Sequence, residues 1–301
     1  MNGLARTVAL DRPVDLRLTL GPVRRGRLDP TVRFAAHEAW RATRTPEGPA
    51  TTRIVSAGAN VTVRAWGPGA AWALEAAPAL VGALDDRRPF VPRDRVVGDL
   101  HRRLGGLRLG RTGAVTEAIV PSILEQKVIG LEARRSYAAL VRTLGEPAPG
   151  PLPGLMLPPS PAVLAHTPAH VFHRFGVERK RADAIRVAAS YARRLEEAAS
   201  LPLAEAYARL TALPGVGPWT AAEVAMVALG DPDAVSVGDY HLPHHVAFAL
   251  AGEPRADDAR MLELLEPYRG QRGRVVRLIM AGGPAPPRFG PRLPLNPIAA
   301  M

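Results

Sequence analysis

Apolar and polar residues alternate along the first third of the chain, which is the pattern of β-strands with one buried face. The alternation covers residues 14–20 and 60–66, and residues 51–55 form a short β-branched run. Stretches rich in polar and turn-forming residues at 43–50 and 56–59 predict loops between these strands.

A segment rich in Ala and Leu at residues 70–84 predicts a helix, which Pro78 kinks or splits in two. We therefore expect a first domain over residues 1–88 that consists of an antiparallel sheet with a helix on one face. A polar, arginine-containing segment then marks the boundary. The predicted fold class is α+β, with an all-α region over residues 89–301.

Helical periodicity dominates this second region. Helices are predicted over residues 116–124, 130–144, 168–175, 178–199, 257–265 and 273–280. In the first of these, Pro121 either bends the helix or marks its first turn. Residues 146–161 hold seven prolines and two glycines, so we expect a stiff connecting loop there.

Residues 213–221 read Leu-Pro-Gly-Val-Gly-Pro-Trp-Thr-Ala and lie between two apolar stripes of helical spacing. This pattern predicts two amphipathic helices joined by a tight hairpin. Gly215 and Gly217 let the backbone turn sharply and approach another molecule, and Pro218 suits the first turn of the second helix. The amides of the turn are expected to point outward, where they can bind an anion such as a nucleic-acid backbone.

Asp239 lies twenty residues beyond Trp219 and directly before another apolar helical stretch. A lone aspartate at such a position is most often a helix N-cap. If the second hairpin helix ends near residue 229 and the chain returns through residues 231–233, Asp239 comes back to the hairpin.

The composition narrows the possible chemistry. Cysteine is absent, which excludes disulfides, zinc-thiolate sites, iron-sulfur clusters and cysteine nucleophiles. No apolar run reaches the roughly 18 residues that cross a membrane, and the first ten residues do not resemble a signal peptide. We expect a soluble, monomeric, cytoplasmic protein without membrane contact.

The net charge of +11 favours a polyanionic partner, although an arginine excess also fits a GC-rich genome. Only two of the 39 basic residues are lysines, Lys127 and Lys180. Six arginines and no acidic residue fall between positions 267 and 301, which predicts a phosphate-facing surface. A basic cluster within residues 179–186 fits a solvated helix face as well as a DNA contact.

The hairpin sequence, followed by Val-Gly-Asp-Tyr at residues 237–240, resembles the helix-hairpin-helix signature of DNA base-excision glycosylases. Among these proteins it is most similar to the bacterial 3-methyladenine DNA glycosylase II family. Residues 123–128 resemble that family's intercalating loop, and the sheet-plus-helix first domain resembles its N-terminal part. The similarity therefore covers most of the chain.

This resemblance implies an enzyme that binds double-stranded DNA, flips out an alkylated or deaminated purine and hydrolyses its N-glycosidic bond. Asp239 would stabilise the positive charge that develops on the sugar and orient water. Trp219 and Tyr240 match positions that contact the base, and Tyr268 fits either such a contact or ordinary core packing. The residues implied in DNA binding are Gly215, Val216, Gly217, Thr220, Gln126 and Lys127.

The resemblance implies no required cofactor. Similar proteins hold a monovalent cation, Na⁺ or K⁺, on carbonyl oxygens of the hairpin. The corresponding carbonyls belong to Thr211, Leu213 and Val216.

Three positions bear on mechanism and on base preference. Lys127 stands where the family usually inserts an apolar wedge, so either Lys127 or Gln126 fills the gap left by a flipped base. Glu223 stands where an aromatic pocket residue can lie, and a solvated glutamate fits this position equally well. Trp219 occupies the place of the lysine with which related enzymes form a Schiff base, so the resemblance implies a monofunctional glycosylase.

Two other functions stay open. The chain could be a non-catalytic helix-hairpin-helix DNA-binding protein in which Asp239 only caps a helix, or a glycosylase that also cuts the strand through Lys127. His241, His244 and His245 have a spacing suited to metal ligands. Without neighbouring carboxylates or cysteines they indicate surface or phosphate contacts instead.

Overall fold

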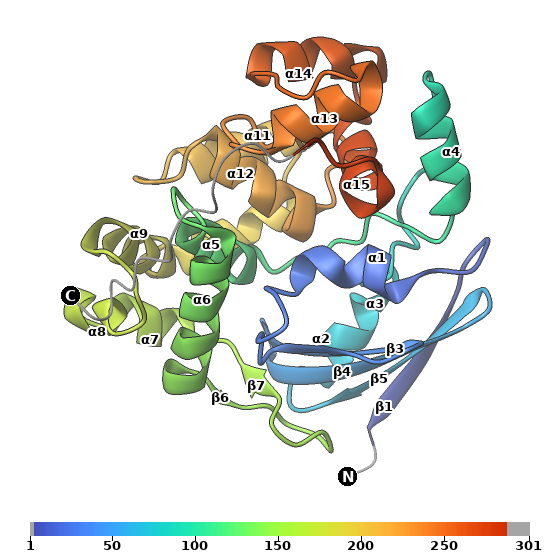
Figure 1. Ribbon diagram of the computed structural model, residues 1–301. Helices are drawn as coiled ribbons and strands as arrows, with labels where there is room; N and C mark the ends of the chain where they lie inside the picture. Colours follow the sequence, from blue (N-terminus) through green and yellow to red (C-terminus); the bar gives the residue numbers. More distant parts are fainter. Residues whose placement is uncertain (1–2, 288–301) are drawn as a thin grey trace.

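The computed structural model describes residues 3–287 and begins with the predicted antiparallel sheet (Figure 1). Its five strands pair in the order β1-β5-β4-β3-β2. They are β1 (Leu4–Ala9), β2 (Val32–Phe34), β3 (Glu38–Thr45), β4 (Gly48–Ala57) and β5 (Asn60–Trp66). The strands predicted at residues 51–55 and 60–66 are confirmed, and they pair with each other so that Ile54 lies opposite Val63.

The strand predicted at residues 14–20 is instead a short helix, α1 (Leu16–Leu20), followed by a 3₁₀ turn, η1 (Gly21–Val23). Asp15 caps α1, because its carboxylate accepts a hydrogen bond from the Leu18 amide at 3.0 Å. Leu16 and Leu20 are both buried, and their four-residue spacing fits one face of a helix as well as one face of a strand. The alternation alone did not distinguish the two, whereas the cap favours the helix.

The loop predicted at residues 43–50 is also wrong, because β3 and β4 meet there in a tight hairpin. β3 runs to Thr45 and β4 starts at Gly48. The Thr45 hydroxyl donates to the Gly48 carbonyl at 2.8 Å. Gly48 has a φ of +118°, a backbone conformation that favours glycine.

The two faces of the sheet carry different apolar cores. On one face, α2 (Ala70–Glu75) and α3 (Ala77–Leu80) share a core with Ile54 and Val63. Pro78 lies in the first turn of α3, so the predicted helix is split there. On the other face Trp40 and Trp66 stack with their ring centroids 5.5 Å apart, beneath the proline-rich loop and its short strands β6 (Glu146–Pro147) and β7 (Met156–Leu157).

Helices make up most of the remaining chain, as predicted. In order they are α4 (Arg95–Arg103), α5 (Val115–Leu124), α6 (Gly130–Leu144), α7 (Pro161–His166), α8 (Ala169–His173), α9 (Arg179–Ser190), α10 (Ala192–Glu196), α11 (Leu203–Thr211), α12 (Pro218–Val224), α13 (Leu242–Ala251), α14 (Asp258–Leu265) and α15 (Arg272–Gly282). Shorter helical turns of other types are η2 (Glu197–Ser200), η3 (Ala225–Leu229) and η4 (Glu266–Tyr268). Within residues 3–287, no helix is both long enough and apolar enough to span a bilayer.

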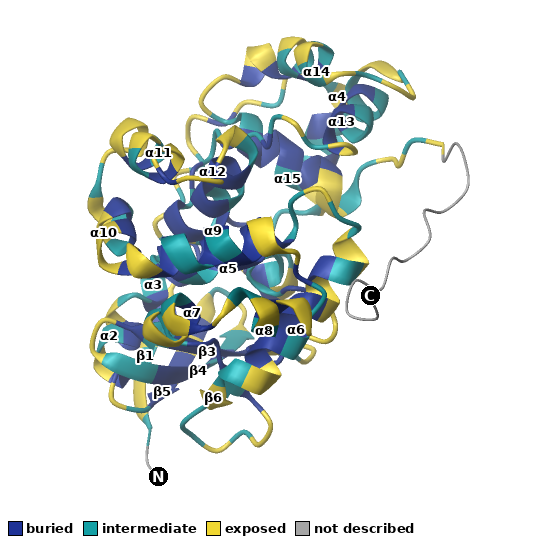
Figure 2. Cartoon of the chain, turned by 90° about the vertical axis from the view of Figure 1, so that its left-hand side faces the viewer, coloured by how far each residue is buried: buried dark blue, intermediate teal, exposed yellow. Residues whose placement is uncertain are grey.

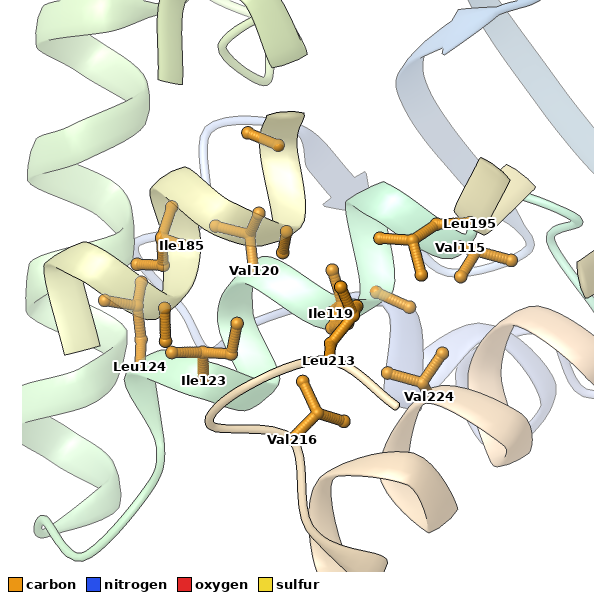
Figure 3. Packing of buried hydrophobic residues seen from close by; sticks show 14 of the residues in the cluster. Val115, Ile119, Val120, Ile123, Leu124, Ile185, Leu195, Leu213, Val216 and Val224 are labelled. Atoms are coloured by element: carbon orange, nitrogen blue, oxygen red, sulfur yellow. The ribbon is translucent and has the colours of Figure 1, made fainter. Parts of the chain in front are cut away.

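The central helix is α5, in which every residue except Glu117 is buried. It passes through the largest apolar core, and Pro121 lies inside it rather than at its first turn (Figure 3). Figure 2 shows buried residues gathered where the helices meet one another and the sheet. The segment after α5 is therefore attached to a well-packed element.

Charged side chains fasten the helical region to the sheet. The Glu117 carboxylate accepts hydrogen bonds from the Thr43 hydroxyl at 2.9 Å and the Arg44 amide at 2.7 Å, and it pairs with Arg41 at 2.7 Å. These contacts hold α5 in register with β3. The division of the chain into residues 1–88 and 89–301 stays a prediction.

Candidate active site

The predicted hairpin joins α11 to α12, and its backbone faces outward. Pro214, Gly215, Gly217 and Pro218 are all exposed. Gly215 has a φ of +84°, whereas Gly217 is extended at −95° and a Cβ atom added to it meets nothing within 4 Å. No residue of the described chain accepts a hydrogen bond from the amides of Gly215 or Gly217. The hairpin thus presents free backbone donors on an open surface.

The inner side of the hairpin is anchored on α5. Leu213 and Val216 are buried in the same core as Ile119 and Ile123, and Figure 3 shows the four side chains gathered between the two elements. Because apolar burial fixes this side, the outward backbone is held in place without using its own amides.

A single side chain bridges the hairpin and the segment that follows α5. Gln126 Nε2 donates to the Gly215 carbonyl and to the Thr220 hydroxyl, each at 2.8 Å. The Gln126 amide is therefore engaged with the hairpin, and the two predicted DNA-binding segments form one surface.

Lys127 is the residue of this segment that projects. Lys127 is exposed and has a φ of +54°. No other non-glycine residue among those described has a positive φ. Behind it, buried Arg181 donates from Nη1 to the Leu124 carbonyl at 2.8 Å, which supports the end of α5. Of the two alternatives for filling the gap left by a base, this geometry favours Lys127 over Gln126.

Asp239 does return to the hairpin. Its Oδ2 accepts a hydrogen bond from Trp219 Nε1 at 3.2 Å, while Oδ1 accepts from the amides of His241 and Leu242 at 2.8 and 2.9 Å. The carboxylate therefore caps the start of α13 and also lies beside α12. The two interpretations of Asp239 as a cap and as a site residue are compatible.

The segment that carries Asp239 is tied to two further elements. The Gly238 amide donates to the Asp258 carboxylate at 2.9 Å, at the start of α14. Asp233 accepts hydrogen bonds from the Arg272 amide and from Nε, both at 2.9 Å, at the start of α15. Such long-range contacts position the carboxylate independently of the hairpin.

Glu223 lies one helical turn beyond Trp219, on the same face of α12. The Ser236 hydroxyl donates to Glu223 Oε1 at 2.5 Å. Burial raises the pKa of Glu223, and the nearby Glu125 and Asp239 carboxylates act in the same direction. Ser236 could not be identified from the sequence. No sequence pattern indicates that this serine contacts Glu223 of α12.

The two candidate tyrosines differ in their surroundings. Tyr240 is 79% exposed, and its ring lies 4.9 Å from that of His241 in an edge-on arrangement. Tyr268 is only 3% exposed; its hydroxyl donates to Asp94 Oδ2 at 2.6 Å and accepts from the Arg93 amide at 2.8 Å. Tyr268 is therefore part of the core around α4, because its ring and hydroxyl are both used there, and of the two alternatives this favours ordinary core packing over a contact with a base.

The candidate cation ligands are backbone carbonyls at the hairpin. The Leu213 carbonyl accepts a hydrogen bond from the Val216 amide at 3.1 Å. Among the described residues, none outside α11 donates to the Thr211 carbonyl, and none donates to the carbonyl of Val216 in the turn. Lone pairs remain on these oxygens, and carbonyl oxygens suit Na⁺ or K⁺. The residues thus fit a monovalent cation, whose presence stays a proposal.

No metal cluster emerges from the histidines: across residues 3–287, no group of three or more His, Cys, Asp or Glu side chains could hold a metal ion. His244 Nδ1 instead accepts a hydrogen bond from the Ala256 amide at 3.1 Å.

Among the described residues, the arginines near the C-terminus have partners within the protein and do not form the predicted phosphate-facing surface. Arg274 is buried and pairs with Asp85, Arg272 pairs with Asp233, and Arg269 pairs with exposed Glu266. Arg277 is directed inward and donates to the Leu18 carbonyl. The other two, Arg288 and Arg292, lie outside the described residues. These side chains mainly connect segments within the protein.

The cluster at residues 179–186 is mixed. Arg181 is 2% exposed, and both Arg179 and Arg186 pair with Asp183, at 3.7 and 3.2 Å. Lys180 is exposed. Most of this cluster therefore has protein partners.

No family model matches the sequence. A curated relative from Mycobacterium tuberculosis, described as a probable bifunctional transcriptional activator/DNA repair enzyme AlkA, is 36% identical over 141 residues. The match covers 46% of this chain and 28% of the relative, so the chain spans less than a third of that protein.

Solved structures match over nearly the whole chain. The 3-methyladenine DNA glycosylase from Archaeoglobus fulgidus superposes with a TM-score of 0.77 at 19% identity, covering 91% of this chain and 97% of that protein. The 8-oxoguanine glycosylase/lyase from Clostridium acetobutylicum superposes with a TM-score of 0.69 at 13% identity, covering 93% and 99%. The chain therefore has the helix-hairpin-helix fold of the DNA glycosylases, and its resemblance to the 3-methyladenine DNA glycosylases is confirmed by this fold together with the sequence match.

Proposed function

We propose that the protein is a monofunctional DNA glycosylase of base-excision repair, which releases alkylated or deaminated purines from double-stranded DNA. The observation that carries this proposal is the hydrogen bond from Trp219 Nε1 to Asp239 Oδ2, beside a hairpin with free backbone amides. Names of similar proteins support the same class of activity.

DNA binding begins at the hairpin in this proposal. The free amides of Gly215 and Gly217 hold a phosphate, supported by Val216 and Thr220. Lys127 enters the space of the base that leaves the stack, while Gln126 keeps the projecting segment attached to the hairpin. The extruded base then lies against Trp219, with Tyr240 at the rim.

Catalysis rests on the carboxylate of Asp239. Rupture of the glycosidic bond leaves positive charge on the sugar, which a fixed carboxylate stabilises. Its three hydrogen bonds hold Asp239 in one orientation, so little reorganisation is needed during the reaction. The same carboxylate orients the water that adds to the sugar carbon.

Strand cleavage is not expected. A lyase step needs an amine that forms a Schiff base, and position 219 holds a tryptophan. The whole chain has two lysines, and Lys127 projects from a separate segment. If borohydride traps no covalent complex with duplex DNA containing a lesion, the monofunctional class is supported; trapping that is lost in Lys127→Ala would establish the lyase alternative.

The decisive test compares wild type with Asp239→Asn on duplexes that carry 7-methylguanine or hypoxanthine. Asparagine can still cap α13, so the variant should fold and bind DNA, yet release either base at least about 100-fold more slowly. Asp257→Asn is a matched control, because Asp257 caps α14 through the Arg260 amide in the same manner.

Equal base release by wild type and Asp239→Asn would reject the mechanism. Salt-dependent binding without release of any base would instead establish the alternative, a non-catalytic DNA-binding protein.

We further propose that the protein acts in the cytoplasm as a monomer with no required cofactor, and that Na⁺ or K⁺ at the hairpin carbonyls only supports the turn.

A further inference from the structure

Glu223 is a second carboxyl group at the candidate active site, and the proposed mechanism does not use it. It shares one face of α12 with Trp219, whose indole contacts Asp239. Ser236 donates to Oε1 of Glu223, whereas no described residue donates to Oε2. One carboxyl oxygen is thus fixed, and the other is free to meet a ligand beside Trp219.

The charged groups around Glu223 come from four separate segments. Arg25 and Arg277 are the cations, and Glu125 and Asp239 are the anions. Arg25 is itself paired with Glu125 at 3.5 Å, and Arg277 is directed to the Leu18 carbonyl.

Burial outweighs the two cations and raises the pKa of Glu223. The pKa of Arg277 is lowered by its burial to about 10, so that side chain stays charged at neutral pH. The surroundings of Glu223 thus favour its un-ionised form over a second anion beside Asp239.

We propose that Glu223 is a catalytic general acid, whose un-ionised carboxyl donates a proton from Oε2 to the leaving purine. The inference rests on the proposed glycosylase function and assigns a further residue to the release of one of its substrate classes. Purines that are neutral while attached to DNA, such as hypoxanthine, are released together with cationic alkylpurines.

The chemistry divides between the two carboxyl groups. As the bond between the sugar C1′ and the purine nitrogen breaks, its electron pair stays on the purine, and the proton of Glu223 moves to a ring nitrogen of the base. Water adds to C1′ and gives a proton to Asp239. That proton returns to Glu223 through solvent, so the sum is one water consumed, one purine released and one abasic site formed.

The charge of the lesion distinguishes a general-acid role of Glu223 from a structural role. A 7-methylguanine base is already cationic and leaves as a neutral molecule, so it needs no proton. Hypoxanthine leaves as an anion unless it is protonated. General-acid catalysis contributes roughly 10²–10⁴-fold to such a step, and the contribution should appear only with the neutral lesion.

The test measures single-turnover release of both bases by wild type, Glu223→Gln and Glu205→Gln. Glutamine keeps the size of the side chain but supplies no acidic proton, and Glu205 is an exposed control on α11. We expect Glu223→Gln to lose at least about 100-fold in hypoxanthine release and less than about threefold in 7-methylguanine release. Glu205→Gln should change neither.

The pH dependence provides an independent signature. Because the pKa of Glu223 is raised, wild-type hypoxanthine release should fall as the pH rises through that pKa. Release of 7-methylguanine should show no such fall. In Glu223→Gln, the residual release of hypoxanthine should also no longer fall with rising pH.

Infrared difference spectra of wild type minus Glu223→Gln, recorded at a pH below the fall in hypoxanthine release, give a readout without turnover. They should contain the carbonyl band of a protonated carboxylic acid. Lack of this band overturns the proposal, as does an equal loss on both lesions.

A greater loss on 7-methylguanine would also overturn it, because an ionised Glu223 would then be pairing with a cationic base. Base release by the wild type is measured first. If it releases neither base, the proposed glycosylase function is rejected, and this outcome is distinct from any difference between the variants.

Discussion

Trp219 and Asp239 lie twenty residues apart in the chain, yet the indole Nε1 donates a hydrogen bond to Asp239 Oδ2 at 3.2 Å. The contact joins the second helix of the hairpin to the cap of α13. Since Oδ1 is already held by two backbone amides, the indole fixes the remaining rotation of the carboxylate. One hydrogen bond thus couples the hairpin to the carboxylate that we propose to be catalytic.

Replacing Trp219 by phenylalanine tests this coupling. The variant keeps an aromatic face for the base but loses the donor to Asp239. A hydrogen bond to a charged group contributes roughly 1.5–3 kcal/mol, so base release should slow by about tenfold or more. Single-turnover rates at saturating enzyme measure the effect separately from binding.

Trp219→Ala serves as the comparison, because it removes the stacking face as well. We expect it to weaken lesion binding in addition to slowing release. Unchanged release in Trp219→Phe would show that the indole hydrogen bond has no catalytic part.

The two hairpin glycines should respond differently to alanine. Gly215 has a positive φ, and a Cβ atom there lies 3.0 Å from Cβ of Ala184. Gly215→Ala should therefore lower the free energy of unfolding by about 1–2 kcal/mol, as measured by urea denaturation.

Gly217→Ala should leave folding nearly unchanged, since its backbone is extended and its surroundings are open. The added methyl group instead obstructs a phosphate at the exposed amide, and we expect duplex affinity to fall about tenfold. Normal DNA binding by Gly217→Ala would argue against close approach of the backbone at this position.

Gln126 should matter for both stability and binding. Gln126→Ala removes the donor to Gly215 and Thr220, which should lower the free energy of unfolding by about 1–2 kcal/mol. Gln126→Glu should be at least as harmful, because a carboxylate faces the Gly215 carbonyl without a proton to donate. Urea unfolding and fluorescence-anisotropy titration with duplex DNA measure the two effects, and stability equal to wild type in both variants would contradict the bridge.

Lys127 combines an unusual backbone with an exposed charge. Lys127→Gly relieves the positive φ of +54°, so we expect it to be about 1 kcal/mol more stable than Lys127→Ala. Both variants should be impaired in flipping the base out of the duplex. The fluorescence of 2-aminopurine placed beside the lesion measures this step. If the lysine also contacts phosphate, the slope of log affinity against log salt should shrink by about one.

The Asp233–Arg272 pair should make stability depend on pH. Burial acts to raise the pKa of Asp233, but the hydrogen bonds and charge of Arg272 outweigh it and hold the pKa below its ordinary value of 3.8. A carboxyl whose pKa is lowered by folding stabilises the fold above its unfolded pKa and ceases to do so as the pH falls through the folded one. Wild type should therefore exceed Asp233→Asn by about 1 kcal/mol at pH 7, and the difference should shrink below about pH 4.

Urea denaturation of both proteins between pH 7 and pH 3 measures this difference. A gap that is constant across the range would show that the carboxylate charge does not contribute. Because Asp233 anchors the segment that ends at Asp239, a loss of base release in Asp233→Asn at neutral pH is also expected.

The conformational preferences of neighbouring residues were sufficient to predict the hairpin. Gly215, which adopts a positive φ, and Pro218, in the first turn of α12, favour a sharp turn followed by a helix. The strands at residues 51–55 and 60–66 and the helix over residues 130–144 likewise follow from periodicity. The absence of cysteine and the scarcity of lysine are properties of the composition alone.

Local rules failed where a segment fits two structures equally well. Residues 16–20 satisfy both a strand and a helix, and the Asp15 cap favours the helix. The Thr43 and Arg44 positions were expected in a loop, but they belong to β3, where they bind Glu117 of α5. The second outcome depends on a partner more than 70 residues away in the chain.

By itself, then, the sequence determined the exposed turn between α11 and α12, the helices around it and the presence of an aspartate twenty residues beyond Trp219. Only the tertiary structure decided that Asp239 meets the indole, that Tyr268 and Arg274 are part of the interior, and that Ser236 meets Glu223. The physical reason is that backbone conformation depends on neighbouring residues, whereas burial and pairing of side chains depend on which distant segments pack together.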